Sequence, residues 1–196
     1  AEVSDMLSPI GDYAMPDREV KTIRDLIFFQ YAKIIGRSAF GPNAKKDAYG
    51  FIKAKFRELR DDETKWSDIL REDQQFVQGP RECVYCGAGD NLQWEHIVAR
   101  SLVVNERCPG CDRIQGIHNM VWACRACNAS KGAKGFYHFI RDSHPEARKI
   151  SDLAPVLAEK KYLKTMYFCH ICNGTLHSTI TDHPISVLDI DLPTGR

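Results

Sequence analysis

The sequence lacks any apolar run that approaches the roughly 20 residues needed to cross a bilayer. Its first residues, AEVSDMLSPIGDY, also lack the basic segment and the apolar segment of a secretory signal. Low-complexity tracts are absent too, and nothing repeats apart from short cysteine pairs. From these absences we expect a globular protein that works in the cytoplasm and has no membrane partner.

A strong charge of either sign is also missing, because 27 Lys and Arg nearly balance 26 Asp and Glu for a net charge of +1. The chain as a whole is therefore not a polycation. The balance varies locally, with eleven basic and five acidic residues between positions 17 and 60. This basic stretch is compatible with a nucleic-acid footprint, but charge alone favours a solvated helix face.

Unpaired cysteines are missing as well, because all eight cysteines lie in Cys-x-x-Cys pairs. The pairs are Cys83/Cys86, Cys108/Cys111, Cys124/Cys127 and Cys169/Cys172. In a cytoplasmic chain this spacing favours metal ligands over disulfides, and a redox site would need only one pair. Two thiolates in one tight turn can face a single tetrahedral zinc ion, with Zn–S distances of about 2.3 Å. Four pairs therefore match two zinc sites of four thiolates each.

Composition and periodicity divide the chain into three regions. Residues 1–80 show helical periods interrupted by loops and form an N-terminal helical region. Residues 81–134 carry six of the eight cysteines and have little helical period. Residues 135–196 return to helical patterns and contain the last cysteine pair. The sequence thus predicts an α+β fold, in which a mainly helical chain surrounds a small ββα unit with two structural zinc sites.

Apolar spacing and turn residues place the expected elements within these regions. Helices are expected over residues 17–35, 44–60, 66–77 and 124–131, from 135 to a break at Pro145, and again from about 155, and strands over 92–98 and 119–123. Gly36 is the expected stop of the first helix. The two strands are separated by a long segment in which Gly110 and Gly116 favour irregular backbone.

The middle region contains CVYCG, LQWEHIVARS and HNMVWACRACNASKG in that order. Together these parts resemble the HNH nuclease family, whose core is a ββα-metal finger. The resemblance covers about residues 83–132, about a quarter of the chain, and is specific because all the parts occur together. It implies an endonuclease that hydrolyses DNA phosphodiester bonds, of the kind used in restriction or phage defence. DNA is then the partner, and a homodimer or a larger defence complex is compatible with one short chain.

The resemblance also implies roles for four residues of this chain. His96 resembles the general base, and an imidazole suits that role because its pKa lies near neutral pH. Glu95 resembles the acidic metal ligand, where Asp is more usual, and Asn128 completes the metal site. Asn119 resembles the residue that braces the loop and orients the base. Hard oxygen ligands suit Mg2+ or Mn2+, so one catalytic ion is implied beside the zinc.

The positions of Glu95 and His96 raise a geometric question, because neighbours on a regular strand point to opposite faces. The resemblance implies that the pair lies where a long loop leaves the first strand, so both side chains can serve one site. Basic residues near the strand end and the helix are expected to contact nucleic acid. They are Arg100, Arg125 and Lys131.

The cysteines are assigned to the two zinc sites by their position around the hairpin. One set brackets the hairpin and comprises Cys83, Cys86, Cys124 and Cys127. The other set follows by elimination and comprises Cys108, Cys111, Cys169 and Cys172. Four pairs allow three pairings, and the sequence alone does not choose among them. A histidine could also replace a thiolate in the second site, the candidates being His170, His177 and His183.

Two other interpretations fit part of this pattern. A non-catalytic zinc module that binds nucleic acid or protein would keep the cysteines but would not need Glu95, His96 and Asn128 together. A nuclease that acts on RNA or on one special DNA structure would keep both the cysteines and these three residues.

Overall fold

The computed structural model describes residues 17–41, 46–66, 69–102, 108–147, 153–181, 183 and 185–192. Within them lie two strands, three 3-10 helices (η) and seven α-helices. The elements run α1 (Ile23–Phe40), α2 (Lys46–Arg60), α3 (Ile69–Gln78), β1 (Leu92–His96), η1 (Arg100–Leu102), α4 (Pro109–Gln115), η2 (Ile117–Asn119), β2 (Met120–Cys124), α5 (Arg125–Lys131), α6 (Phe136–Ser143), α8 (Val156–Cys172) and η3 (Val187–Ile190). The predicted α+β class is confirmed. No helix in this part of the chain is both long and apolar enough to cross a membrane.

The first helix begins later and ends later than the sequence predicts. Its start is fixed by a capping box, in which Asp25 N donates to Thr22 Oγ1 and Thr22 N donates to the Asp25 carboxylate. Gly36 does not stop the helix, which continues to Phe40. A Cβ at position 36 would lie 2.6 Å from Ile52 Cγ1, so the glycine lets α2 approach closely.

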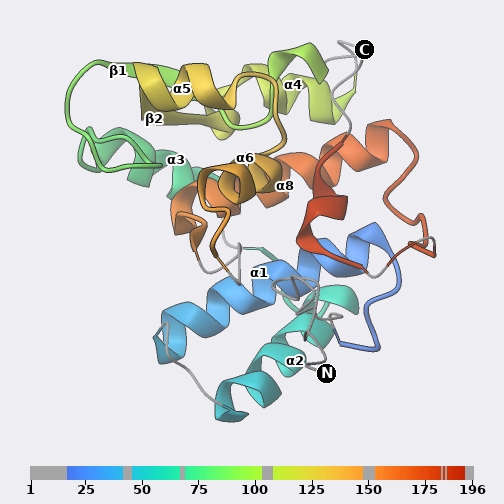
Figure 1. Ribbon diagram of the computed structural model, residues 1–196. Helices are drawn as coiled ribbons and strands as arrows, with labels where there is room; N and C mark the ends of the chain where they lie inside the picture. The colour runs from blue at the N-terminus through green and yellow to red at the C-terminus, as the bar shows by residue number, and fades with distance from the viewer. Residues whose placement is uncertain are drawn as a thin grey trace, which may run out of the picture.

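Helices α1 and α8 form the centre of the molecule, with α2 on the outer side of α1 (Figure 1). The buried carboxylate of Glu159 on α8 ties them together. It accepts from Gln30 Nε2 at 2.9 Å and Tyr137 Oη at 2.8 Å, and it pairs with Arg37. The largest buried cluster takes side chains from all three regions that the sequence distinguishes, such as Leu26, Val121 and Tyr162. The region boundaries at 80 and 134 stay a prediction.

The hairpin lies above this helical base, between two helices (Figure 1). Its strands pair antiparallel, with Trp94 opposite Trp122 and Glu95 opposite Val121. Gln93 and Glu95 contact α5 through side-chain bonds. On the opposite face, Phe76 of α3 packs against both tryptophans. The two strands that the sequence predicts thus form one two-stranded sheet, each within two residues of its expected ends.

Helix α8 also holds α3 and the start of β2 in place through two buried lysines. Lys164 Nζ lies 2.7 Å from Glu72 Oε2, and Lys161 Nζ lies 3.0 Å from Asp73 Oδ1. Lys161 also donates to the carbonyls of Ile117 and Met120. These contacts fix where the hairpin lies on the helical base.

The sequence predicts irregular backbone between the two strands. Part of this segment instead forms the helix α4. Cys108 caps this helix by accepting from Cys111 N at 3.3 Å, and Pro109 occupies its first turn. Helix α4 lies directly on α8, where a Cβ at Gly110 would come within 2.8 Å of the Cys169 backbone nitrogen. The last cysteine pair does not follow α8 but lies in its final turn.

Candidate metal centre and nuclease site

The first two cysteines of the candidate metal centre lie in a tight turn before β1. Cys83 N donates to Ala88 O at 2.7 Å, and Gly87 N donates to Cys83 O at 2.8 Å. Gly87 has φ +75°, a left-handed conformation that glycine adopts at little cost. Val84 N donates to Trp122 O at 2.8 Å, which fastens the turn to β2.

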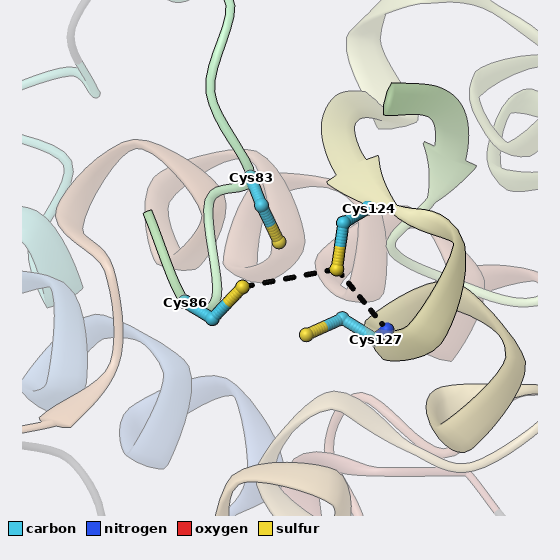
Figure 2. Close-up of side chains that lie close together, drawn as sticks. All are labelled: Cys83, Cys86, Cys124 and Cys127. Atoms are coloured by element: carbon cyan, nitrogen blue, oxygen red, sulfur yellow. Dashed lines mark hydrogen bonds between the residues drawn. The ribbon is translucent and has the colours of Figure 1, made fainter. Parts of the chain in front are cut away.

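The other two cysteines lie where β2 ends and α5 begins. Cys124 caps α5, and its sulfur accepts from Cys127 N at 3.4 Å. Figure 2 shows the four side chains converging from the turn and from the start of α5. The four sulfurs, those of Cys83, Cys86, Cys124 and Cys127, all lie within 4.8 Å of one another. The predicted grouping of these four cysteines is confirmed, and it is compatible with one zinc ion.

The pKa values of two of these thiols also favour a bound cation. Burial raises the pKa of Cys83, but hydrogen bonds from the backbone of Cys124, Cys86 and Tyr85 lower it to about 7. Burial and the neighbouring thiols raise the pKa of Cys127 far above its ordinary value. The Cys83 thiol therefore loses its proton readily, whereas ionisation of the Cys127 thiol is unfavourable. A zinc ion removes this conflict because it stabilises all four thiolates together.

The second set of cysteines converges between α4 and α8 but does not present four thiols. Cys108 and Cys172 form a disulfide, so neither is a thiolate in this structure. The Cys111 sulfur lies 3.2 Å from that of Cys108, and Cys169 is buried beside Cys111. Among the described residues, the hairpin cluster is the only group of three or more Cys, His, Asp or Glu that could hold a metal. The predicted second zinc site is therefore not formed in this state.

The histidines considered for the second site have other environments. Both ring nitrogens of His170 are engaged, Nδ1 with Thr175 Oγ1 at 2.8 Å and Nε2 with Ile190 O at 2.9 Å. His183 Nε2 lies 2.6 Å from Asp189 Oδ1, and His177 is exposed. Hydrogen bonding of this kind accounts for His170 and His183 without a metal.

Glu95 lies in a buried ion pair. Its side chain faces α5, where Lys131 Nζ lies 2.7 Å from Glu95 Oε1. Lys131 is fully buried and also donates to His96 O at 3.2 Å. Burial raises the pKa of Glu95, and the Lys131 charge opposes that shift. The expectation that Lys131 contacts nucleic acid is corrected here, because its ammonium is enclosed and neutralises Glu95.

The sequence contains a signal for this pair in the spacing of Asn128 and Lys131. Lys131 follows Asn128 by three residues, so the two lie on one face of α5. Asn128 Nδ2 donates to Gln93 Oε1 at 3.2 Å, which turns that face toward β1. A residue one turn further along α5 must then approach Glu95, two residues after Gln93. Asn128 is half-buried, and its amide oxygen is the atom that suits a cation.

His96 is half-buried at the end of β1. Burial lowers its pKa, and the positive charges of Arg100 and Lys131 lower it further. Both effects favour the neutral imidazole, the form that can accept a proton.

Asn119 holds the backbone that follows His96. It is fully buried, and its side chain accepts from Val98 N at 2.8 Å and donates to Val98 O at 2.8 Å and Ile114 O at 2.9 Å. Its carbonyl accepts from Ile97 N at 2.9 Å. These bonds join the turn after β1 to α4, which is the geometry that a brace requires.

His118, the neighbour of Asn119, lies in a different interaction. Its Nδ1 contacts Asp73 of α3, which also pairs with Lys161. His118 is therefore part of the contact between η2 and α3.

Among the described residues, three arginines near the hairpin in sequence lack the ion pairs that neutralise basic residues on the N-terminal helices. Arg81, Arg100 and Arg125 are exposed and form no ion pair within the described part of the chain. All three flank the hairpin in sequence, Arg81 before the cysteine turn, Arg100 after β1 and Arg125 at the start of α5. Uncompensated arginines beside His96 and α5 are suited to phosphate.

Three basic residues of α2 are instead paired with acidic residues of the chain. Lys53 Nζ lies 3.0 Å from Asp17 Oδ2, and Arg57 and Arg60 pair with Glu19. The positive balance of residues 17–60 therefore does not form a free basic surface on these residues.

No protein-family model, curated protein or solved structure matches the chain.

Proposed function

We propose that this protein is a zinc-braced endonuclease that hydrolyses DNA phosphodiester bonds with one divalent metal ion and His96 as general base. The observation that carries the proposal is the setting of His96. Its imidazole lies at the end of β1, directly before the turn that Asn119 holds, and burial together with the charges of Arg100 and Lys131 lowers its pKa. A positioned neutral base next to uncompensated positive charge is what hydrolysis of a phosphodiester requires.

In this proposal the residues of the hairpin divide the chemistry. His96 takes the proton from the attacking water, and Asn119 keeps the backbone of the base in place. Glu95 and Asn128 supply a carboxylate and an amide oxygen, a donor set that fits Mg2+ or Mn2+. Lys131 lies at Glu95 Oε1, so Oε2 is the oxygen left for an ion. The ion would offset charge on the phosphate and the leaving 3′ oxygen.

The remaining parts support the same chemistry. Arg100 and Arg125 would contact phosphates on either side of the cleaved bond. The zinc at Cys83, Cys86, Cys124 and Cys127 would hold β2 and α5 against the turn before β1, which keeps Asn128 near the strand. The resemblance to HNH nucleases favours a role in restriction or phage defence, either as a homodimer or in a larger complex.

One observation favours a different function. Because Glu95 is already paired with a buried lysine, the hairpin could be a stable zinc module that binds nucleic acid without cutting it. Both functions predict zinc and DNA binding, so only cleavage separates them.

Cleavage of supercoiled plasmid tests the proposed function. The zinc-loaded protein is expected to convert the plasmid to the relaxed form when Mg2+ or Mn2+ is added, and to leave it intact without either ion. Ligation of the products should show 5′-phosphate and 3′-hydroxyl ends. A protein that binds DNA but relaxes no plasmid with either ion would favour the non-catalytic module.

We also propose a second zinc ion in the reduced protein, held by Cys108, Cys111, Cys169 and Cys172. The convergence of these cysteines between α4 and α8 supports it. Reduction of the disulfide would return two thiols to the two already present. Metal analysis of protein purified with a reductant is expected to give two zinc ions per chain, and oxidised protein one. One zinc ion per chain in both preparations would refute this second site.

A further inference from the structure

An aromatic platform, formed by Trp94, Trp122 and the buried Phe76, lies on the hairpin face opposite α5. Trp94 is 55% exposed. Its ring meets Trp122 at 5.8 Å between centroids and Phe76 at 6.2 Å, both edge to face. Such pairs add about 0.5–1.5 kcal/mol each beyond buried area. The two neighbours therefore hold the Trp94 ring in a fixed orientation while much of its surface faces solvent.

The platform lies beside the candidate nuclease residues in the same strand. Trp94 immediately precedes Glu95 and stands two residues before His96. Glu95 faces α5 and Trp94 faces away from it, whereas His96 ends the strand about 7 Å along from Trp94. Stacked nucleotides of one strand rise by about 3.4 Å each. A DNA strand with a phosphate at His96 would thus bring a base one or two nucleotides away to Trp94.

Positive charge lies at the Trp122 ring of the platform and near His96. The Arg81 guanidinium is 5.5 Å from the Trp122 ring centroid, and Arg100 follows His96 by four residues. Neither arginine has an ion-pair partner among the described residues. An apolar peptide would gain little from these charges, whereas a DNA backbone complements them. Aromatic rings with nearby cations are the combination that binds single strands.

We propose that Trp94 stacks on an unpaired nucleobase of the substrate. The substrate class is then DNA with an unpaired base next to the cleaved phosphate, either a single strand or a duplex with one base displaced. A base inside an intact duplex has no free face for the ring, because its neighbours cover both sides. The inference rests on the proposed nuclease function and narrows its substrate.

Binding of fluorescently labelled DNA, measured by anisotropy without added Mg2+ or Mn2+, tests the proposal separately from cleavage. The probes are a single strand of about 12 nucleotides, which suits one binding surface, and its fully paired duplex. The wild type is expected to bind the single strand more tightly than the duplex. Trp94→Ala should weaken single-strand binding roughly tenfold or more, while Trp94→Phe retains most of the affinity.

Two further variants keep the result interpretable. Trp94→Leu keeps apolar volume without a flat ring, and it should lose as much affinity as Trp94→Ala even if the alanine variant folds poorly. Phe40→Ala removes a ring of similar exposure, 49%, at the end of α1, and it should bind like the wild type.

The outcomes separate this inference from the proposed function. Equal single-strand affinity in the wild type and Trp94→Leu overturns the stacking proposal, and so does tighter binding of the duplex by the wild type. If the protein still cuts plasmid in either case, the nuclease function stands and only the stacking role fails. A protein that neither binds nor cuts DNA contradicts both.

Discussion

Replacing Cys83 with serine is expected to remove one zinc ion per chain and to unfold the hairpin around it. Cys83 is 1% exposed, and its sulfur lies within 4.8 Å of those of Cys86, Cys124 and Cys127. Structural zinc contributes about 10–16 kcal/mol of binding free energy in small zinc peptides. A whole domain is commonly stable by only about 5–15 kcal/mol. The melting temperature should therefore fall by about 10 °C or more.

Zinc content, the melting temperature and amide hydrogen exchange measure this effect together. In Cys83→Ser, exchange should accelerate at amides that are protected in the cysteine turn before β1 and in the hairpin, such as those of Val84 and Arg125. Amides in the middle of α1 and α8 should stay protected because they belong to the main core. Ser130→Ala, an exposed change on α5, is the control and should behave like the wild type. Wild-type zinc content in Cys83→Ser would show that this cluster does not bind zinc as described.

A second large effect is expected from Lys131→Met. Removal of the ammonium leaves the Glu95 carboxylate buried without the charge that now lies 2.7 Å away. Breaking a buried pair by removing one partner typically costs about 3–5 kcal/mol. Urea unfolding should report a loss of that size. Lys134→Met is the control, because Lys134 is 46% exposed and its pair with Asp142 lies at the surface, where such pairs contribute little.

The double variant Glu95→Gln/Lys131→Met separates the structural role of Glu95 from its catalytic one. Loss of both charges removes the unpaired carboxylate, so stability should return close to that of the wild type. Plasmid cleavage should not return, because an amide replaces the proposed metal-binding carboxylate. Wild-type cleavage by a stable double variant would exclude Glu95 as the metal ligand.

The hairpin and its first cysteine set were predictable because their signals are local. Apolar and polar residues alternate over Leu92–His96, which predicts a strand there. Cys-x-x-Cys pairs before β1 and at the end of β2 predict the two turns that carry the cysteines. Gly87 supports the first of these turns in the same local way. The four cysteines then meet because β1 and β2 pair, so one tertiary contact is enough to complete the cluster.

Other features depended on contacts between distant segments. The sequence predicts that Gly36 ends a helix and that Gly110 favours irregular backbone. Gly36 instead lies within α1 where α2 packs against it, and Gly110 lies within α4 where α8 packs against it. Helix α4 is short, and its packing on α8 has no trace in its own periodicity. Three basic residues of α2 appeared free because their partners, Asp17 and Glu19, lie 34 to 41 residues earlier in the chain. Lys131 appeared to be a phosphate ligand for the same reason.

Cleavage of plasmid by zinc-loaded wild type and His96→Ala, side by side with Mg2+, is the most direct test of the central claim. Loss of a general base commonly costs about 10²–10⁴-fold in rate. We predict that the wild type relaxes the plasmid and that His96→Ala is slower by a factor in that range, while His144→Ala, a change at the half-exposed residue that caps α6, matches the wild type. Equal cleavage by the wild type and His96→Ala, or no cleavage by either, would contradict the account.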